Sequence, residues 1–172
     1  MKKLLFIFIF LLSFLSNAQS SDNSESKTSL VKMGDSFPNF TYLNKDGKSN
    51  KSQDLKGKVV LINFFATWCG PCMVEMPLLQ KEIWEQYKSN DNFKLISFGR
   101  DHSLKEVNDF IKAKNFDFEI CPDKGKIIYN LFATQYIPRN YLIDKNGKIV
   151  YVSVGYSEAE FQILKEKIKS LL

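Results

Sequence analysis

Two cysteines separated by two residues, Cys69 and Cys72, are the side chains of this sequence best suited to chemistry. The thiolate is the reactive form of cysteine, and a free thiol with a pKa near about 8.5 is mostly protonated at neutral pH. A helix N-terminus carries unpaired N–H groups and roughly half a positive charge, which stabilise a nearby anion. Two thiols at this spacing, at the beginning of a helix, could exchange between a dithiol and a disulfide.

A buried strand and a helix are predicted on either side of these cysteines. The run Val59–Phe65 is continuously apolar, which is typical of a strand buried on both faces. Apolar residues recur at helical spacing after the cysteines. Pro71 falls in the first helical turn, where a missing N–H costs nothing, and Gly70 leaves room for a partner. Cys69 is therefore expected where the strand meets the helix, with Cys72 one turn further on.

The other candidate residues are isolated in the sequence. Cys121 lies in a segment where apolar residues would serve, and it is expected to be a buried free thiol rather than a third redox centre. His102, the single histidine, is expected at the surface or as a capping residue. With one histidine and no second cysteine pair, neither a metal site nor a cofactor is predicted.

The composition is that of one ordinary globular domain with an N-terminal extension. Of the 172 residues, 44% are hydrophobic and 25% are charged. The formal net charge is +5, but lysines are interspersed with acids rather than clustered. Nucleic-acid binding is therefore not predicted.

Residues 1–18 have the pattern of a secretory signal peptide. A short basic head precedes the apolar run Leu4–Leu15, which is shorter than the ~20 residues that span a bilayer, and Ala18 offers a small residue at a cleavage site. An uncleaved membrane anchor is the alternative. Removing Lys2 and Lys3 leaves 22 basic against 19 acidic residues and a net charge of +3. Export would place the cysteines in an oxidising compartment, where thiol pairs persist as disulfides.

The remaining sequence divides into a polar segment and one folded domain. Residues 19–32 are rich in serine and are expected to form a flexible tether, and residues 33–172 to form the domain. Strands and helices alternate early, and a hairpin and a helix follow, which predicts a mixed sheet with helices on both faces. Strands are expected at 41–43, 59–65, 93–98, 116–120, 141–144 and 149–154, with helices at 71–88, after Ser103, at 126–132 and at 157–171.

Several stretches resemble the thioredoxin superfamily and, more narrowly, its exported TlpA/ResA-like branch of thiol–disulfide oxidoreductases, which is related to the redoxins. The match covers residues 33–172 and implies a thioredoxin-like α/β fold, in which a central mixed β-sheet is flanked by helices on both faces and carries an N-terminal β-hairpin addition. The residues that carry it are Phe64–Cys72, the pattern C-x-x-E-x-P over Cys72–Pro77, the dipeptide Ile137-Pro138, and the lead-in segments Gly34–Phe40 and Asp54–Lys58.

The resemblance implies a mechanism of thiol–disulfide exchange. Cys69 would attack a disulfide of a partner protein, and Cys72 would then release the reduced partner. Pro138 would follow a cis bond and lie against the sulfurs, and the backbone of Ile137 would pair with a substrate strand. Gly-Pro between the cysteines matches reducing thioredoxins near about −270 mV rather than strong oxidants near about −120 mV, so a reductase is expected.

The partners that the resemblance implies lie outside the cytoplasm. The substrate would be a disulfide-containing protein, for example an apocytochrome c, and a membrane electron donor would re-reduce the centre. The protein is expected to act as a monomer in the periplasm or another extracytoplasmic space.

The acid that assists Cys72 is the first departure from the family pattern. Cytosolic thioredoxins carry a buried Asp where this chain has Asn63, which cannot take a proton, and Arg100 stands where ResA-like members have Glu. Glu75, one helical turn after Cys72, is the acid we expect to take this role, with Asp101 next in line. An exposed helix residue is the alternative for Glu75, since most acids on helices are solvated.

Residues beside the cysteines are expected to contact partners. Arg139 follows the proline, where the family usually has Thr. With the family geometry its guanidinium would lie beside Cys69, lower the pKa of that thiol and favour acidic partners. A solvent-facing arginine at a strand end is the alternative. Trp68 is expected to form a contact surface for partners.

Two other functions compete with a disulfide reductase. A peroxiredoxin-like peroxidase shares the N-terminal addition, but such enzymes need a Thr three residues before the attacking cysteine, and this chain has Ala66 there. A non-catalytic binding module would hold the two cysteines as a static disulfide.

Overall fold

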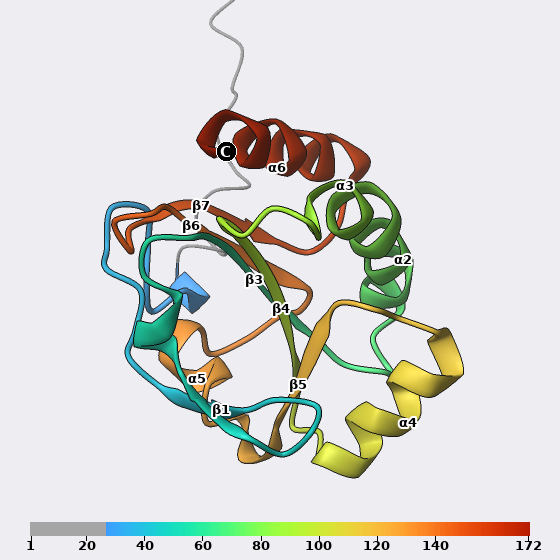
Figure 1. The fold of residues 1–172 in the computed structure, drawn as a ribbon. Coiled ribbons are helices and arrows are strands. Elements are labelled where there is room, and N and C mark those ends of the chain that lie inside the picture. The colour runs from blue at the N-terminus through green and yellow to red at the C-terminus, as the bar shows by residue number, and fades with distance from the viewer. Residues whose placement is uncertain (1–26) are drawn as a thin grey trace, which may run out of the picture.

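The computed structural model describes residues 27–172, which form a five-stranded mixed sheet covered on both faces (Figure 1). The signal peptide predicted over residues 1–18 and most of the predicted tether lie outside the described residues. Among the residues described, no helix is long and apolar enough to cross a bilayer.

The sheet is arranged around the strand that leads into the two cysteines. Its order is β5-β4-β3-β6-β7, in which β3 runs parallel to β4 and antiparallel to β6. All seven residues of β3 are buried, as the unbroken apolar run predicts. The strands are β3 (Val59–Phe65), β4 (Phe93–Arg100), β5 (Glu119–Asp123), β6 (Arg139–Ile143) and β7 (Ile149–Val154).

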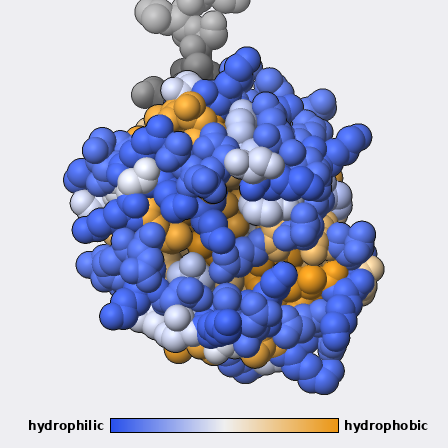
Figure 2. All heavy atoms as spheres, viewed as in Figure 1, coloured by the Kyte–Doolittle hydropathy of each residue, from blue (hydrophilic) through white to orange (hydrophobic). Residues whose placement is uncertain are grey.

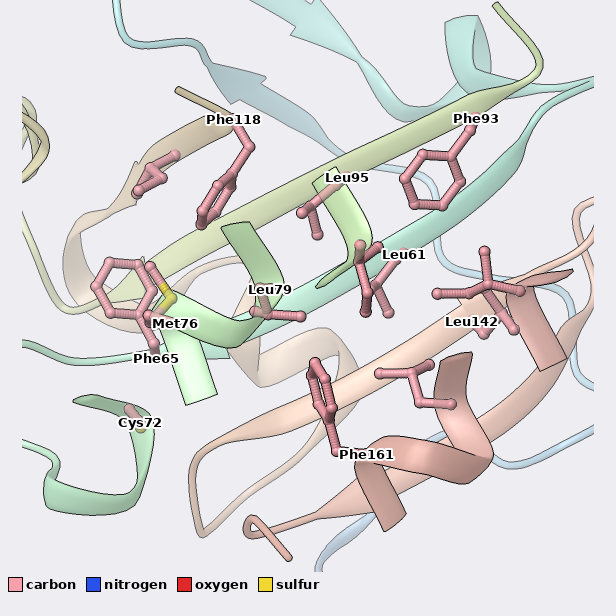
Figure 3. Packing of buried hydrophobic residues seen from close by; sticks show 14 of the residues in the cluster. Leu61, Phe65, Cys72, Met76, Leu79, Phe93, Leu95, Phe118, Leu142 and Phe161 are labelled. Carbon is pink, nitrogen blue, oxygen red and sulfur yellow. The ribbon is translucent and has the colours of Figure 1, made fainter. Parts of the chain in front are cut away.

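Two layers cover the sheet, as expected for this fold class. One face packs against α2 (Gly70–Leu78), α4 (Leu104–Lys114) and α6 (Glu158–Leu171). The other packs against α5 (Tyr129–Phe132) and the antiparallel hairpin of β1 (Thr41–Leu43) and β2 (Ser49–Lys51). In the first layer Met76 and Leu79 face the sheet residues Leu61 and Leu95 (Figure 3). This packing fixes the helix that begins after Cys69.

The helix predicted over 71–88 is divided. α2 ends at Leu78, a π-helical segment η2 (Leu79–Trp84) follows, and α3 (Glu85–Tyr87) completes it. Pro77 lies inside α2 and has no N–H to donate to the preceding turn. The widened turn begins two residues later, and such turns occur mostly as local insertions in α-helices.

Several boundaries differ from the sequence prediction, among them the end of β4, which is two residues later than expected, and the beginning of β6, which is two residues earlier. The strand expected at 116–120 lies at Glu119–Asp123, because Phe116 and Phe118 belong to an aromatic cluster that precedes the strand. The helix expected at 126–132 is a 3₁₀ turn η3 (Lys124–Lys126) followed by α5. The carboxylate of Asp123 accepts the N–H groups of Ile128 and Tyr129, at 2.8 and 2.9 Å, just before and at the start of α5.

The last part of the predicted tether lies against the domain. Ser29 forms an antiparallel bridge with Ala133, and the N–H of Leu30 donates to the carbonyl of Phe132 at 2.9 Å. These bonds place residues 28–30 beside the end of α5, on the side of the sheet opposite α2.

Candidate active site

Cys69 and Cys72 form a disulfide at the beginning of α2. The S–S distance is 2.10 Å and the Cα atoms are 5.3 Å apart. Cys69 is the N-cap residue, with extended backbone angles, and Pro71 lies in the first turn, as predicted. The structure therefore shows the oxidised form of the pair.

The two sulfurs differ in their surroundings. Cys69 is 6% exposed, whereas Cys72 is completely buried beneath it. The backbone N–H of Cys72 donates to Sγ of Cys69 at 3.3 Å. This N–H and the helix dipole both favour negative charge on the Cys69 sulfur once the disulfide is reduced. Only Cys69 offers any surface to a partner.

The Ile137–Pro138 peptide lies beside the disulfide and is cis, as the resemblance implied. The sulfur of Cys69 lies 3.7 Å from the carbonyl oxygen of Ile137. Pro138 is buried and Ile137 is half-buried. The first residues of β6 thus fix one wall of the site.

Glu75 is buried beneath the site, one helical turn after Cys72. Its carboxylate accepts the side-chain amide of Asn63 at 3.0 Å and that of Asn140 at 2.7 Å. Burial raises the pKa of Glu75 to about 7, although both amide bonds act in the opposite direction. An acid with this pKa can accept or donate a proton near neutral pH.

The partners of Glu75 belong to a row of polar residues that crosses the sheet on its α2 face. Asn63 on β3 lies in register with Ser97 on β4 and with Asn140 on β6, and Asn140 lies in register with Ser153 on β7. Side-chain hydrogen bonds join Ser97 to Asn63 at 3.0 Å, Asn63 to Asn140 at 2.9 Å and Asn140 to Ser153 at 3.3 Å. Asn63 therefore solvates a buried carboxyl group on α2 instead of supplying one.

The residues around Cys69 form an uncharged rim, by which we mean residues 66–74 and 134–138. Neither segment contains Asp, Glu, Lys, Arg or His. Trp68 is 68% exposed and Tyr136 is 55% exposed, which is unusual for large aromatic residues. Figure 2 shows an apolar area between α2 and α4 on an otherwise mainly hydrophilic face.

Arg139 corrects the sequence prediction. Its side chain is completely buried, so it neither lies beside Cys69 as a charged contact for acidic partners nor faces solvent. The guanidinium donates on the opposite side of the sheet, where its neighbours belong to the core around Phe64 and Tyr141. Its acceptors are the carbonyls of Gln135 and Tyr136, the hydroxyls of Ser29 and Tyr141, and Oγ1 of Thr28.

Strand alternation explains this direction. Successive side chains of β6 point to opposite faces. Asn140 points toward Asn63 and Glu75, so Arg139 must point to the other face, together with Tyr141. A period-two analysis of residues 139–143 could have predicted this from the sequence.

The structure also places Asp101 and Cys121, the two remaining candidate residues. Asp101 is exposed and its carboxylate accepts the N–H of Gly125, so it is not a buried acid beneath Cys72. Cys121 is a buried free thiol, as expected, and burial raises its pKa far above the ordinary value. Among residues 27–172, no group of three or more His, Cys, Asp or Glu side chains could hold a metal ion.

His102 is a site residue that the sequence analysis missed. It was expected at the surface or as a cap, but it is buried, and Nε2 of its ring accepts the backbone N–H of Thr67 at 3.0 Å. Nothing in the local sequence around residue 102 indicates this bond, which spans 35 residues.

Comparisons with known proteins agree with this geometry. The family model described as Redoxin matches residues 32–168. The curated protein "Thiol-disulfide oxidoreductase ResA" of Bacillus cereus is 35% identical over 130 residues, which cover 76% of this chain and 74% of that protein.

Solved structures share the same arrangement. A protein from Bacteroides thetaiotaomicron, described as a protein disulfide isomerase, superposes with a TM-score of 0.81 at 39% identity, covering 84% of this chain and 92% of that one. A thiol:disulfide interchange protein of the thioredoxin family from Chlorobium tepidum gives a TM-score of 0.67 at 26% identity, covering 82% and 98%.

The raised pKa of Glu75 predicts a pH-dependent stability that Glu75→Gln removes. Between pH 4.5 and about 7 the folded protein keeps a proton that the unfolded chain has lost, so the free energy of unfolding falls as pH rises through this range, by about 3 kcal/mol. Urea unfolding of the oxidised wild type and the variant at pH 4.5 and 7.5 measures this fall as the difference between the two proteins. The exposed Glu158→Gln serves as the control, and an equal pH dependence in wild type and Glu75→Gln would contradict the assignment.

The buried network of Arg139 predicts a large effect of its removal on stability. Arg139→Leu should lower the free energy of unfolding by about 3 kcal/mol or more, because bonds from a buried charge to two loop carbonyls and to the N-terminal segment are lost. Arg139→Lys keeps the charge but not the planar fork, so an intermediate loss is expected. Guanidinium unfolding of the three proteins tests this order, which a surface arginine would not produce.

Proposed function

The chain belongs to the Redoxin family and is a thiol–disulfide oxidoreductase, and from that premise we propose that it is an exported reductase of protein disulfides. One observation supports the proposal above the others. A disulfide lies at a helix N-terminus with one sulfur partly exposed and the other buried beneath it. This asymmetry assigns a different step to each cysteine.

In the first step the reduced Cys69 attacks the partner. Its thiolate, stabilised by the N–H of Cys72 and the dipole of α2, attacks one sulfur of the partner's disulfide. The bond between the partner's sulfurs breaks, and the sulfur that leaves takes the electron pair as a thiolate. Cys69 and the partner are then joined by a mixed disulfide.

In the second step Cys72 releases the partner. Its thiol must lose a proton before it can attack Sγ of Cys69, and the carboxylate of Glu75, one turn away and with a pKa of about 7, accepts that proton. The mixed disulfide breaks, the second sulfur of the partner leaves as a thiolate, and the Cys69–Cys72 disulfide forms again. Two electrons have passed to the partner, and a dithiol donor must return them.

Recognition of the partner relies on shape and apolar contact. The sulfur of Cys69 contacts the carbonyl of Ile137. The exposed Trp68 directly precedes Cys69, and the exposed Tyr136 directly precedes Ile137. Aromatic side chains of this kind bury large areas at protein interfaces at a small cost in conformational entropy. An extended segment with apolar residues next to its cysteine, as in an unfolded or incompletely matured protein such as an apocytochrome c, would suit this rim.

Cysteine variants test the assigned steps. Cys69→Ser should abolish the reduction of insulin by a dithiol donor, since the attacking sulfur is lost. Cys72→Ser should keep the first step and accumulate mixed disulfides on Cys69, which mass spectrometry of trapped complexes identifies. Cys121→Ser is the matched control and should retain activity, because its thiol is buried. Turnover by Cys69→Ser would refute the mechanism.

Export is tested by the mass and location of the mature protein. In a Gram-negative host the chain should be recovered from the periplasm beginning at Gln19, because the small residue Ala18 precedes the cleavage site. Ala18→Leu should block cleavage and leave the protein in the membrane fraction. Full-length wild-type protein in the cytosol would contradict export, and full-length protein in the membrane would favour the uncleaved anchor.

A further inference from the structure

His102 is buried, and the conformation of the chain at the end of β4 creates the space for its ring. The chain turns sharply there, with φ of +64° at Asp101, and the N–H of His102 donates to the carbonyl of Gly99 at 2.9 Å. A Cβ atom on Gly99 would lie 3.1 Å from Cβ of His102 and 3.1 Å from Val107. The absence of a side chain at Gly99 therefore lets the imidazole lie over the strand.

The ring of His102 bonds the turn that carries the reactive cysteine. It packs edge-on against Phe65, with centroids 6.1 Å apart, and its Nε2 lies 3.0 Å from the backbone nitrogen of Thr67 and 3.1 Å from Oγ1 of Thr67. The turn itself is closed by the N–H of Cys69, which donates to the carbonyl of Ala66 at 3.1 Å. His102 is thus a second anchor of this turn, from the loop that follows β4.

The direction of this hydrogen bond fixes the form of the ring. A backbone N–H can only donate, so the Nε2 that faces Thr67 must accept and carry no proton. The ring is therefore neutral, with its proton on Nδ1. If Nε2 also carried a proton, its N–H would point at the N–H of Thr67, and the hydrogen bond would be lost.

We propose that His102 is a positioning residue for disulfide exchange: its neutral ring holds the Ala66–Cys69 turn so that Trp68 faces the partner and Cys69 stays at the helix N-terminus against Ile137. Trp68 is the exposed aromatic residue of this turn, in which Thr67 is also exposed, and the sulfur of Cys69 already lies 3.7 Å from the carbonyl of Ile137. Displacement of a reacting group by about 1 Å can slow a reaction by about 100-fold, so a single anchor at this place matters.

The charges around the ring are few. The carboxylates of Asp101 and Glu106 interact with His102 electrostatically, and Lys124 pairs with Asp101 at 3.7 Å. The neighbours from β3 and α4, Phe65 and Val107, are apolar. The reduced Cys69 adds a thiolate at the end of the same turn.

Two substitutions separate the hydrogen bond from the volume of the ring. His102→Leu fills the space without an acceptor, whereas the amide oxygen of His102→Gln can take the place of Nε2 and does not titrate. With the full chain reduced, the rate of attack on DTNB divided by the thiolate fraction should fall about 10-fold in His102→Leu and stay within about 2-fold in His102→Gln. Phe110→Leu, which loosens the packing on Phe65, is the matched control and should react as wild type.

The rescue of the rate by His102→Gln is a readout that a purely structural role of the ring would not give. The proposal is overturned if His102→Leu reacts as wild type, if His102→Gln is as slow as His102→Leu, or if Phe110→Leu is equally slow. Should His102→Leu fail to fold, His102→Asn, whose shorter side chain does not reach Thr67, takes its place and should be about as slow as expected for His102→Leu, while a wild-type rate in His102→Asn would overturn the proposal.

This inference rests on the proposed role of Cys69 as the attacking thiol, and the same assay separates the two. If Cys69→Ser still reacts with DTNB at the wild-type rate, the proposed function fails and the inference fails with it. If Cys69→Ser is inactive and His102→Leu is unaffected, only the inference about His102 fails.

Discussion

The carboxyl group of Glu75, held in the interior by the amides of Asn63 and Asn140, is the interaction on which the site depends. Burying an acid without a cation is costly unless its oxygens are hydrogen-bonded, and two asparagines from neighbouring strands supply those bonds. The same bonds tie α2 to β3 and to β6, so the helix that begins after Cys69 and the strand that follows Pro138 are held together. The buried carboxyl group of Glu75 therefore fixes the two elements that carry the sulfurs of the cysteine pair and the carbonyl of Ile137.

The first two residues of β6 serve the two faces of the sheet. Asn140 points toward α2 and bonds Glu75, whereas Arg139 points to the other face and bonds the loop that precedes Pro138. Tyr136, in that loop, has φ of +69°, a conformation that is uncommon for a residue with a side chain. The carbonyl of Tyr136 accepts hydrogen bonds from Arg139 and from the hydroxyl of Tyr129. These bonds hold the loop on its buried side and leave its outer surface free to contact a partner.

Local patterns were sufficient for the parts of the fold that depend on local interactions. The buried strand β3, the helix after Ser103, the closing helix that ends at Leu171, and the cysteines at a helix N-terminus were all predicted and are all present. The π-helical segment after Pro77 was not predicted, because a proline signals a lost bond but not how the helix accommodates it. The face to which Arg139 points follows from strand alternation, but the strand was expected to begin only at residue 141, two residues after Arg139. The hydrogen bond from the N–H of Thr67 to His102 depends on which segments become neighbours in the fold, and the sequence around residue 102 carries no information about that.

The absence of formal charge from the rim also bears on how partners arrive. Proteins that attract one another through opposite surface charges meet faster than diffusion alone allows, and dissolved ions weaken that attraction. Segments 66–74 and 134–138 contribute no charge of their own to such an attraction, so contact at the rim itself should depend less on ionic strength than contact with the charged remainder of the surface. If the protein is exported as proposed, to a space where salinity follows the surroundings of the cell, contacts at such a rim would change little as the medium changes.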